Sequence, residues 1–216
     1  MCPADVAGGD SQRQREGASD KAEGQRERLV AAFAKAASEH GYVRLEVEQV
    51  LRYAGVPRAT FDEHFASKEQ GLVAAQDAFF DRLWLDVLHA CEGPGDWPAK
   101  VRAALGAVLA SLVEASNLAR VFAIEATAAS MAAAERHFAA LDQFAVLLRD
   151  GRRHYPIAES LPDATERALV GGVASIVSGH LLMEDLCAVP SLESELVELV
   201  LIPYLGVSEA RRAASS

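Results

Sequence analysis

Apolar residues along this chain recur mainly at intervals of three and four positions, which is the spacing of amphipathic helices rather than of strands. Between residues 26 and 40 they form one face, made by Leu29, Val30, Phe33, Ala36 and Ala37. A glycine follows at position 41, and glycine readily takes the positive φ that ends a helix. The pattern therefore predicts an all-α chain whose first helix ends at residue 40.

A short helix, a tight turn and a second short helix are predicted between residues 46 and 66. Val47, Val50 and Leu51 give the first of these helices its apolar face, and Phe61 and Phe65 give the second one its own. The turn reads Ala-Gly-Val, and the proline that follows it suits the first turn of a helix, where its missing N–H is not needed. Two short helices joined in this way form a helix-turn-helix, whose second helix can enter the major groove of DNA.

Six further helices are predicted in the rest of the chain. The first starts after Ser67, whose spacing to Gln70 is that of a capping box. Asp96 is expected to cap the next helix, and Asp163 with Glu166 to cap a later one. The expected ranges are 68–91, 97–115, 117–126, 128–153, 163–187 and 190–206, with a frayed end after residue 209.

One set of residues in the first third of the chain has a specific combined spacing. It consists of Gly41-Tyr42, Val47, Val50, Ala54-Gly55-Val56, Thr60-Phe61, His64-Phe65, Ser67-Lys68-Glu69 and Leu72. This set resembles the DNA-binding domain of TetR-type regulators. The resemblance implies an all-α fold with a three-helix DNA-binding head over residues 26–70 and a six-helix effector-binding and dimerisation body over 71–208. Residues 1–25 are polar and are expected to form a disordered tail.

Charge and cysteine usage narrow the function further. The 216 residues carry a formal net charge of −10, but residues 26–70 hold seven basic and seven acidic side chains, so the head is neutral. A neutral head predicts modest non-specific affinity for DNA and a shallow salt dependence. The three cysteines are widely spaced and fit reduced thiols in the cytoplasm. The longest uncharged stretch, 168–183, is shorter than the ~20 residues that span a bilayer, so no membrane partner is expected.

Catalytic motifs are missing from the sequence. Its six histidines form no H-E-x-x-H arrangement, and neither G-x-S-x-G, nor a P-loop, nor G-x-G-x-x-G occurs. We therefore expect no enzyme activity, no cofactor and no metal.

The first turn of the second short helix faces the groove in this motif, so it supplies the candidates for base contact: Arg58, Ala59 and Thr60. Arginine can pair with guanine, and threonine can bond a base or touch a thymine methyl group. The phosphate candidates are Arg44, His64 and Lys68, and the resemblance implies a backbone contact for the lysine. Arg58 also fits a solvated surface charge, and His64 a packing role.

Two departures from the family pattern bear on DNA affinity. Asp62 stands where relatives usually carry a tyrosine that touches phosphate, and Leu45 replaces a threonine that caps the preceding helix. An aspartate at that place repels phosphate. The alternative to a regulator is therefore a TetR-like protein with weakened or lost DNA binding that acts through protein contacts.

Two sets of residues in the body are candidates for a dimer surface and an effector pocket. The dimer candidates are small or apolar residues of the last two predicted helices: Gly172, Ser175, Ile176, Gly179, Leu192, Leu196, Leu199 and Val200. The pocket candidates are Phe80, Trp84, Phe122, Met131, Phe138, Phe144, His180 and Met183. Both sets also fit a monomer core. Because the body is acidic, we expect an apolar effector that is uncharged or cationic.

Together these observations favour a ligand-responsive repressor that binds double-stranded DNA, at a palindromic operator, as a homodimer. The longest predicted helix, after Ser67, is apolar on two sides. It is therefore expected to couple the head to the body.

Overall fold

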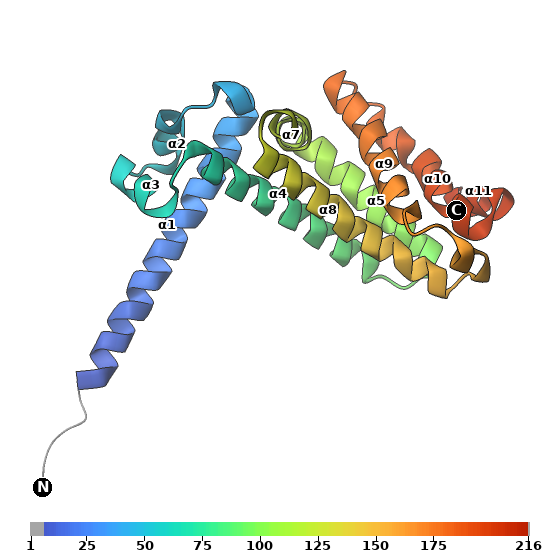
Figure 1. The fold of residues 1–216 in the computed structure, drawn as a ribbon, viewed down its shortest axis with the longest axis horizontal. Coiled ribbons are helices and arrows are strands. Elements are labelled where there is room, and N and C mark those ends of the chain that lie inside the picture. The colour runs from blue at the N-terminus through green and yellow to red at the C-terminus, as the bar shows by residue number, and fades with distance from the viewer. Residues whose placement is uncertain (1–6, 216) are drawn as a thin grey trace, which may run out of the picture.

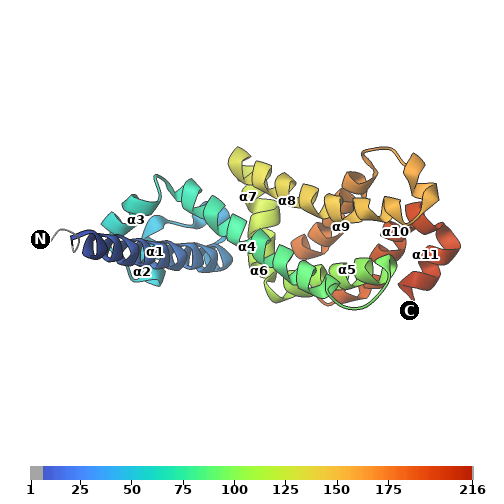
Figure 2. The same ribbon diagram turned by 90° about the horizontal axis from the view of Figure 1, so that it is seen from below.

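The computed structural model describes the backbone of residues 7–215 and the side chains of residues 21–215. The molecule is elongated, with a head at one end and a body at the other (Figures 1 and 2). The head consists of α1 (Ala7–Arg44), α2 (Val47–Ala54) and α3 (Arg58–His64). From there α4 (Lys68–Cys91) runs out of the head and along the body.

The body contains the remaining helices. In chain order these are α5 (Trp97–Glu114), α6 (Ser116–Arg120), a π-helical turn (Val121–Glu125), α7 (Ala126–Ala129), α8 (Met131–Arg149), two 3₁₀ turns (Asp150–Arg153 and Pro156–Ser160), α9 (Thr165–Leu182), a third 3₁₀ turn (Val189–Leu192), α10 (Glu193–Leu205) and α11 (Val207–Ala214). Helix α5 packs against α4 and α10, and α8 packs against α4 and α9. The cavity of the body lies among these four elements, α4, α5, α8 and α9.

The predicted all-α class is confirmed for the described residues, and the helix count differs by one. The segments α6, the π turn and α7 follow one another without a break and count as one helix. Residues 7–215 therefore form ten helices, whereas nine were predicted. The additional helix is α11, where fraying was expected. Its Ala210 and Ala214 are buried in the body core, so tertiary packing holds a segment whose local pattern is weak.

The disordered tail expected over residues 1–25 is wrong for residues 7–25, which are helical and continue into α1. Residues 1–6 lie outside the described part. This stretch holds four glycines, which disfavour helix, but ten of its residues are glutamine, arginine, glutamate or alanine, which favour it. The folded helix beyond residue 25 supplies the nucleus from which it extends.

Local signals in the sequence place several of the helix ends. Gly41 has φ of 75° at the break in α1, and Gly55 has φ of 64° after α2, both in the region that glycine adopts without strain. Asp96 accepts a hydrogen bond from the N–H of Ala99 and caps α5 as expected. Ser67 accepts from the N–H of Gln70 and so caps α4.

The core of the head continues into the body. Phe33, Phe61 and Phe65 form an aromatic cluster with ring centroids 5.7–6.0 Å apart. The same apolar cluster includes residues of the π turn and of α8, among them Phe122 and Ala133. The head is therefore packed against the body through one core, and the predicted boundary at residue 70 divides a continuous apolar unit.

Within the described residues, no single helix is long and apolar enough to cross a membrane. Among the helices that the structure describes, one pair, Trp97–Glu114 with Ser116–Ala129, reaches that length and composition when joined, and it is bent by 99° at its break.

Gly71 allows α4 to approach α1. A Cβ atom at this position would lie 2.0 Å from the ring of Phe33, which no real contact permits. We expect Gly71→Ala to lower the free energy of unfolding by about 1–3 kcal/mol through overpacking, measured by urea denaturation.

Gly24 in α1 is the matched control, because a Cβ atom there would meet nothing within 4 Å. Gly24→Ala should leave stability unchanged or raise it by up to about 1 kcal/mol. Equal stability of the Gly71 variant and the wild type would contradict the close approach of α1 and α4.

Candidate DNA-binding and effector sites

Helix α3 has one face in the head core and one face in solvent. Thr60, Phe61 and Phe65 are buried, with Thr60 only 8 % exposed. The outward face is formed by Arg58, Ala59, Asp62 and Glu63. The structure thus contradicts Thr60 as a base-contact residue, since its side chain is turned inward beside Phe61. Residues of the same helical turn point in different directions, so only those on the outer face of α3 can reach a groove.

Arg58 lies at the start of α3 and is engaged by two carboxylates. Its Nε donates a hydrogen bond to Oδ1 of Asp62 at 3.0 Å, and its Nη1 lies 3.6 Å from Oε1 of Glu48. The guanidinium also lies over the ring of Phe61, with its carbon 5.3 Å from the centroid. Arg58 remains 56 % exposed. The side chain is therefore held by contacts with three neighbours while more than half of its surface stays exposed.

The three phosphate candidates differ in their surroundings. Arg44 is exposed at the end of α1. Lys68 donates a hydrogen bond from Nζ to the carbonyl of Leu45 at 3.0 Å, so one of its three donors ties α4 to the loop before α2. His64 is half-buried, and its Nε2 has no hydrogen-bond partner among the described residues.

A cavity of about 610 Å³ lies inside the body. Its walls are mainly aliphatic residues of α4, α5, α8 and α9, with Phe80, Trp97, His137 and Phe144 among them. This volume is in the range of small-molecule sites. The structure thus contains an apolar cavity of the size expected for an effector pocket.

Of the eight predicted pocket residues, Phe80 and Phe144 line this cavity. Trp84 packs edge-on against Phe144, with ring centroids 5.4 Å apart, and does not reach the cavity wall. Phe122 is fully buried in the head core. Four other candidates point elsewhere: Met131, Phe138 and Met183 are exposed, and His180 faces Asp185, with Nδ1 3.5 Å from its carboxylate. The apolar character of a residue alone therefore does not show whether it lines the cavity, lies in the core or is exposed at the surface.

The polar residues of the cavity were missed by the sequence analysis. Lys100, Arg149 and Arg153 lie at one end, together with Asp150, which forms an ion pair of 3.2 Å with Arg153. His137 lies toward the other end, half-buried against Phe80, and its Nδ1 has no partner among the described residues. Burial lowers the pKa of His137, which keeps the imidazole neutral at pH 7. The cavity is therefore apolar along its length with basic residues at one end.

The π-helical turn Val121–Glu125 joins this cavity to the head. Ala123 lines the cavity, and two residues further on the carboxylate of Glu125 accepts a hydrogen bond of 2.9 Å from the N–H of Tyr42. Gln76 of α4 is 1 % exposed and donates to the carbonyl oxygens of Phe122 and Ala133 at 3.0 and 3.1 Å. A π turn disturbs the regular helical bonding pattern, and the buried amide supplies donors there.

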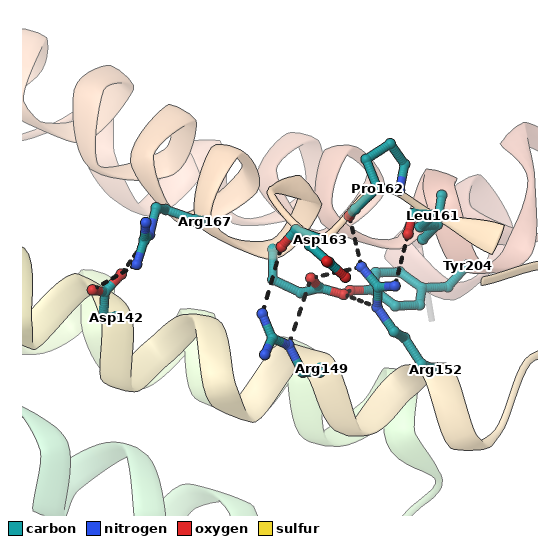
Figure 3. A network of polar contacts seen from close by, with 9 residues as sticks. Asp142, Arg149, Arg152, Leu161, Pro162, Asp163, Arg167 and Tyr204 are labelled. Carbon is teal, nitrogen blue, oxygen red and sulfur yellow. Dashed lines mark hydrogen bonds and ion pairs between the residues drawn. The ribbon is translucent and has the colours of Figure 1, made fainter. Parts of the chain in front are cut away.

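An ion-pair network lies behind the basic end of the cavity (Figure 3). Glu166 of α9 is fully buried and accepts two hydrogen bonds from Arg152, at 2.6 and 3.0 Å, and one from the hydroxyl of Tyr204 at 3.1 Å. Arg152 also donates to the carbonyl oxygens of Leu161 and Pro162, both at 2.8 Å. These bonds fasten the segment after α8 to α9 and α10. Glu166 thus does not form the helix cap predicted for it, because Arg152 draws its carboxylate inward.

The pKa of Glu166 reflects two opposing effects. Burial alone would raise it, but the hydrogen bonds from Arg152 and Tyr204 favour the ionised form and hold the pKa below its ordinary value of 4.5. Burial, together with the adjacent Glu166 carboxylate, raises the pKa of Tyr204. The ring of Tyr204 packs on Trp97, a cavity residue, with centroids 4.6 Å apart.

The predicted dimer residues divide between surface and core. Ser175, Ile176 and Gly179 of α9 and Leu199 of α10 are exposed. Gly172 and Leu192 are half-buried. The structure contradicts Leu196 and Val200, which are 2 % and 1 % exposed in the core of the body. They lie on the inner face of α10, whereas Leu199 lies on its outer face.

Residues 29–75 match the family model described as bacterial regulatory proteins, tetR family. The match covers most of the head, and it confirms the resemblance to this family that is seen in the sequence. A search of curated proteins found no match.

Over most of the chain the fold is shared with solved protein structures, among them transcriptional regulators. The fatty acid degradation regulator FadR from Bacillus halodurans aligns with a TM-score of 0.71 at 18 % identity, covering 81 % of this chain and 97 % of that one. FadR from Bacillus subtilis, solved in complex with stearoyl-CoA, aligns with a TM-score of 0.69 at 17 % identity, covering 83 % and 97 %. RolR in complex with resorcinol aligns with a TM-score of 0.64 at 18 % identity, covering 91 % and 96 %.

Glu166 makes the stability of the body dependent on pH. Because its pKa is lowered on folding, its stabilisation is fully present above about pH 4.5 and is lost as pH falls through the lower folded value. Glu166→Gln should lower the free energy of unfolding by about 3 kcal/mol at pH 7, since it removes one charge of a buried pair, and should reduce the loss of stability on acidification. Thermal unfolding at pH 7 and pH 3 measures both effects.

Glu159 is exposed in the second 3₁₀ turn and serves as the control carboxylate. Glu159→Gln should match the wild type at both pH values. An equal effect of the two substitutions would show that the buried pair contributes nothing specific.

Proposed function

We propose that this protein is a transcriptional repressor that binds a palindromic operator as a homodimer and releases it when an effector occupies the body cavity. The observation that carries the proposal is the exposed Arg58 at the start of α3, in a head that matches the tetR family model. The match supports a DNA-binding transcriptional regulator. The cavity and its connection to the head support control by a ligand.

The homodimer is supported by glycines on α9 that packing within the chain does not explain. A Cβ atom added at Gly171, Gly172 or Gly179 would meet nothing within 4 Å. Ile176 is exposed on the same helix, and Leu199 is exposed on α10, which contacts α9. Small residues allow helices to approach closely, so a second copy of this face can pack against the first. A two-fold dimer presents two α3 helices to two half-sites.

The chemistry of the cavity favours an elongated apolar effector with an anionic end. His137 and Arg149 are twelve residues apart on α8, which corresponds to about 18 Å along the helix. Between them the wall is mainly aliphatic, and the basic end offers Lys100, Arg149 and Arg153 to an anion. This revises the uncharged or cationic effector expected from the acidic body, because the local charge at the site outweighs the distant net charge. The stearoyl-CoA bound by a FadR neighbour has this chemistry.

Coupling follows the path from Ala123 to Glu125 to the head. A ligand that displaces the π turn at Ala123 also shifts the carboxylate that holds the N–H of Tyr42. Gly41, beside Tyr42, is packed so tightly that a Cβ atom there would lie 2.9 Å from Glu125. The ligand acts to the extent that it binds the released state more tightly than the DNA-bound state.

DNA binding is tested by a mobility-shift titration with the DNA upstream of the protein's own coding sequence at low and moderate salt. We expect a complex with two chains per site, and at least tenfold weaker binding by Arg58→Ala because a base contact is lost. Sedimentation of the same sample measures the stoichiometry.

Arg82→Ala removes an exposed arginine from the body part of α4, where it pairs with Asp86, and should bind as the wild type does. No retardation at low salt would exclude the regulator for this DNA. That result would favour the alternative of a TetR-like protein that works through protein contacts, which the carboxylates around Arg58 also suit.

Effector chemistry is tested with palmitate, hexadecanol and hexadecylamine, which share one chain length and differ in the end group. Trp97 lines the cavity, so intrinsic fluorescence reports binding. We expect palmitate to bind at least tenfold more tightly than the alcohol or the amine and to release DNA. Lys100→Glu combined with Arg153→Glu should abolish that preference, since charge-assisted hydrogen bonds are lost.

Lys21→Glu reverses one basic charge at exposed residue 21 of α1, outside the cavity, and should leave the preference intact. Glu125→Gln should keep palmitate affinity within about twofold and weaken the release of DNA, because it removes the charge that holds the Tyr42 N–H. Preferential binding of the amine would contradict the anionic end group.

A further inference from the structure

We propose that Asp62 is a positioning residue for base recognition: its hydrogen bond to Nε holds Arg58 with both terminal amino groups directed at a guanine. The inference rests on the proposed DNA-binding function and goes beyond it, since it assigns the base that is read and the residue that enforces the reading. The departure at position 62 then serves specificity and is more than a source of repulsion.

The contacts of Arg58 leave the N–H donors on its two terminal nitrogens available for a base. An arginine side chain has five N–H donors, one on Nε and two on each terminal nitrogen. Nε is used by Asp62 at 3.0 Å, whereas Nη1 lies 3.6 Å from Glu48 and makes no hydrogen bond to it. Both terminal nitrogens therefore keep donors for the O6 and N7 acceptors of guanine, which take two parallel hydrogen bonds.

Two contacts orient the guanidinium. Asp62 lies one helical turn after Arg58 and holds its edge, and the ring of Phe61 lies beneath it at 5.3 Å. Phe61 is itself locked in the aromatic cluster of the head. A flexible side chain that is already oriented loses less conformational freedom when it binds, so the discrimination between bases becomes larger.

The two carboxylates near Arg58 have different consequences. Asp62 binds Nε, which guanine does not need in this arrangement, so its hydrogen bond persists in the complex. Glu48 approaches Nη1, which guanine does need, so it competes with the base. Both charges reduce attraction to phosphate on any sequence. The hydrogen bond of Asp62 alone is expected to raise the preference for one base.

A plain surface ion pair makes a different prediction. Exposed pairs contribute little, and an aspartate that only repels phosphate would, on removal, raise affinity for every sequence equally. The readout that separates the two roles is therefore the base preference at one position of each half-site, rather than the affinity.

The experiment selects binding sites from a library of random duplexes with the full-length protein and sequences the bound DNA. The variants are Arg58→Ala, Asp62→Ala, Asp62→Asn and Glu63→Ala. Glu63 is the matched control, because it is the next exposed carboxylate of α3 and, within residues 21–215, has no ion pair with Arg58. Asparagine keeps a carbonyl oxygen that can accept from Nε without the negative charge. Thermal unfolding confirms that each surface variant is folded.

We expect the wild type to select a guanine in each half-site with about 5- to 150-fold preference, the range of a bidentate arginine–guanine contact. Arg58→Ala and Asp62→Ala should both lose most of that preference. Asp62→Asn should retain it, and Glu63→Ala should retain it while binding all sequences more tightly.

The inference is overturned if Asp62→Ala keeps the guanine preference, if Asp62→Asn loses it as the alanine variant does, or if Arg58→Ala leaves it unchanged. Failure of the wild type to select any sequence is a distinct result, because it overturns the proposed function and this inference together.

Discussion

Gln76 is buried where α4 crosses the π-helical turn, and its amide nitrogen binds two backbone carbonyls from different parts of the body. The interaction satisfies polar groups that would otherwise be costly inside an apolar core. It also fixes the turn that carries Ala123 toward the cavity and Glu125 toward the head. The relative position of the head and the body depends on this junction, because the apolar core on both sides of it is one cluster.

The outer face of the proposed recognition helix carries little positive charge. On the outer face of α3 one arginine is accompanied by two acidic residues, and a third carboxylate approaches from α2. Such a surface gains little from general attraction to phosphate, so direct contact with bases must contribute a larger share of the binding free energy. A regulator of this kind trades overall affinity for a higher ratio of specific to non-specific binding. In the proposed dimer, binding of two half-sites at once would add to this affinity.

The body combines a stable end with a cavity that remains accessible. The pair formed by Glu166 and Arg152 holds the segment after α8 against α9 and α10. Arg149, which lies 4.0 Å from Glu166, and Arg153, which pairs with the exposed Asp150, remain at the cavity end. The buried carboxylate therefore pairs with Arg152, which is partly exposed, while the neighbouring basic side chains lie at the surface. The described residues contain no group of three or more His, Cys, Asp and Glu side chains arranged to hold a metal ion.

The sequence by itself determined the helical class, the helix-turn-helix and its glycine turns, because these depend on local periodicity and on backbone preferences of single residues. It also identified the aromatic residues in the core of the head and the small residues on the outer face of α9. The tertiary structure decided which side of each helix is used. Thr60 and Leu196 turned out to be buried, and the polar end of the cavity came from Lys100 and Arg153, which are far apart in the chain. Contacts between distant segments leave no periodic signal, so only the packed chain shows them.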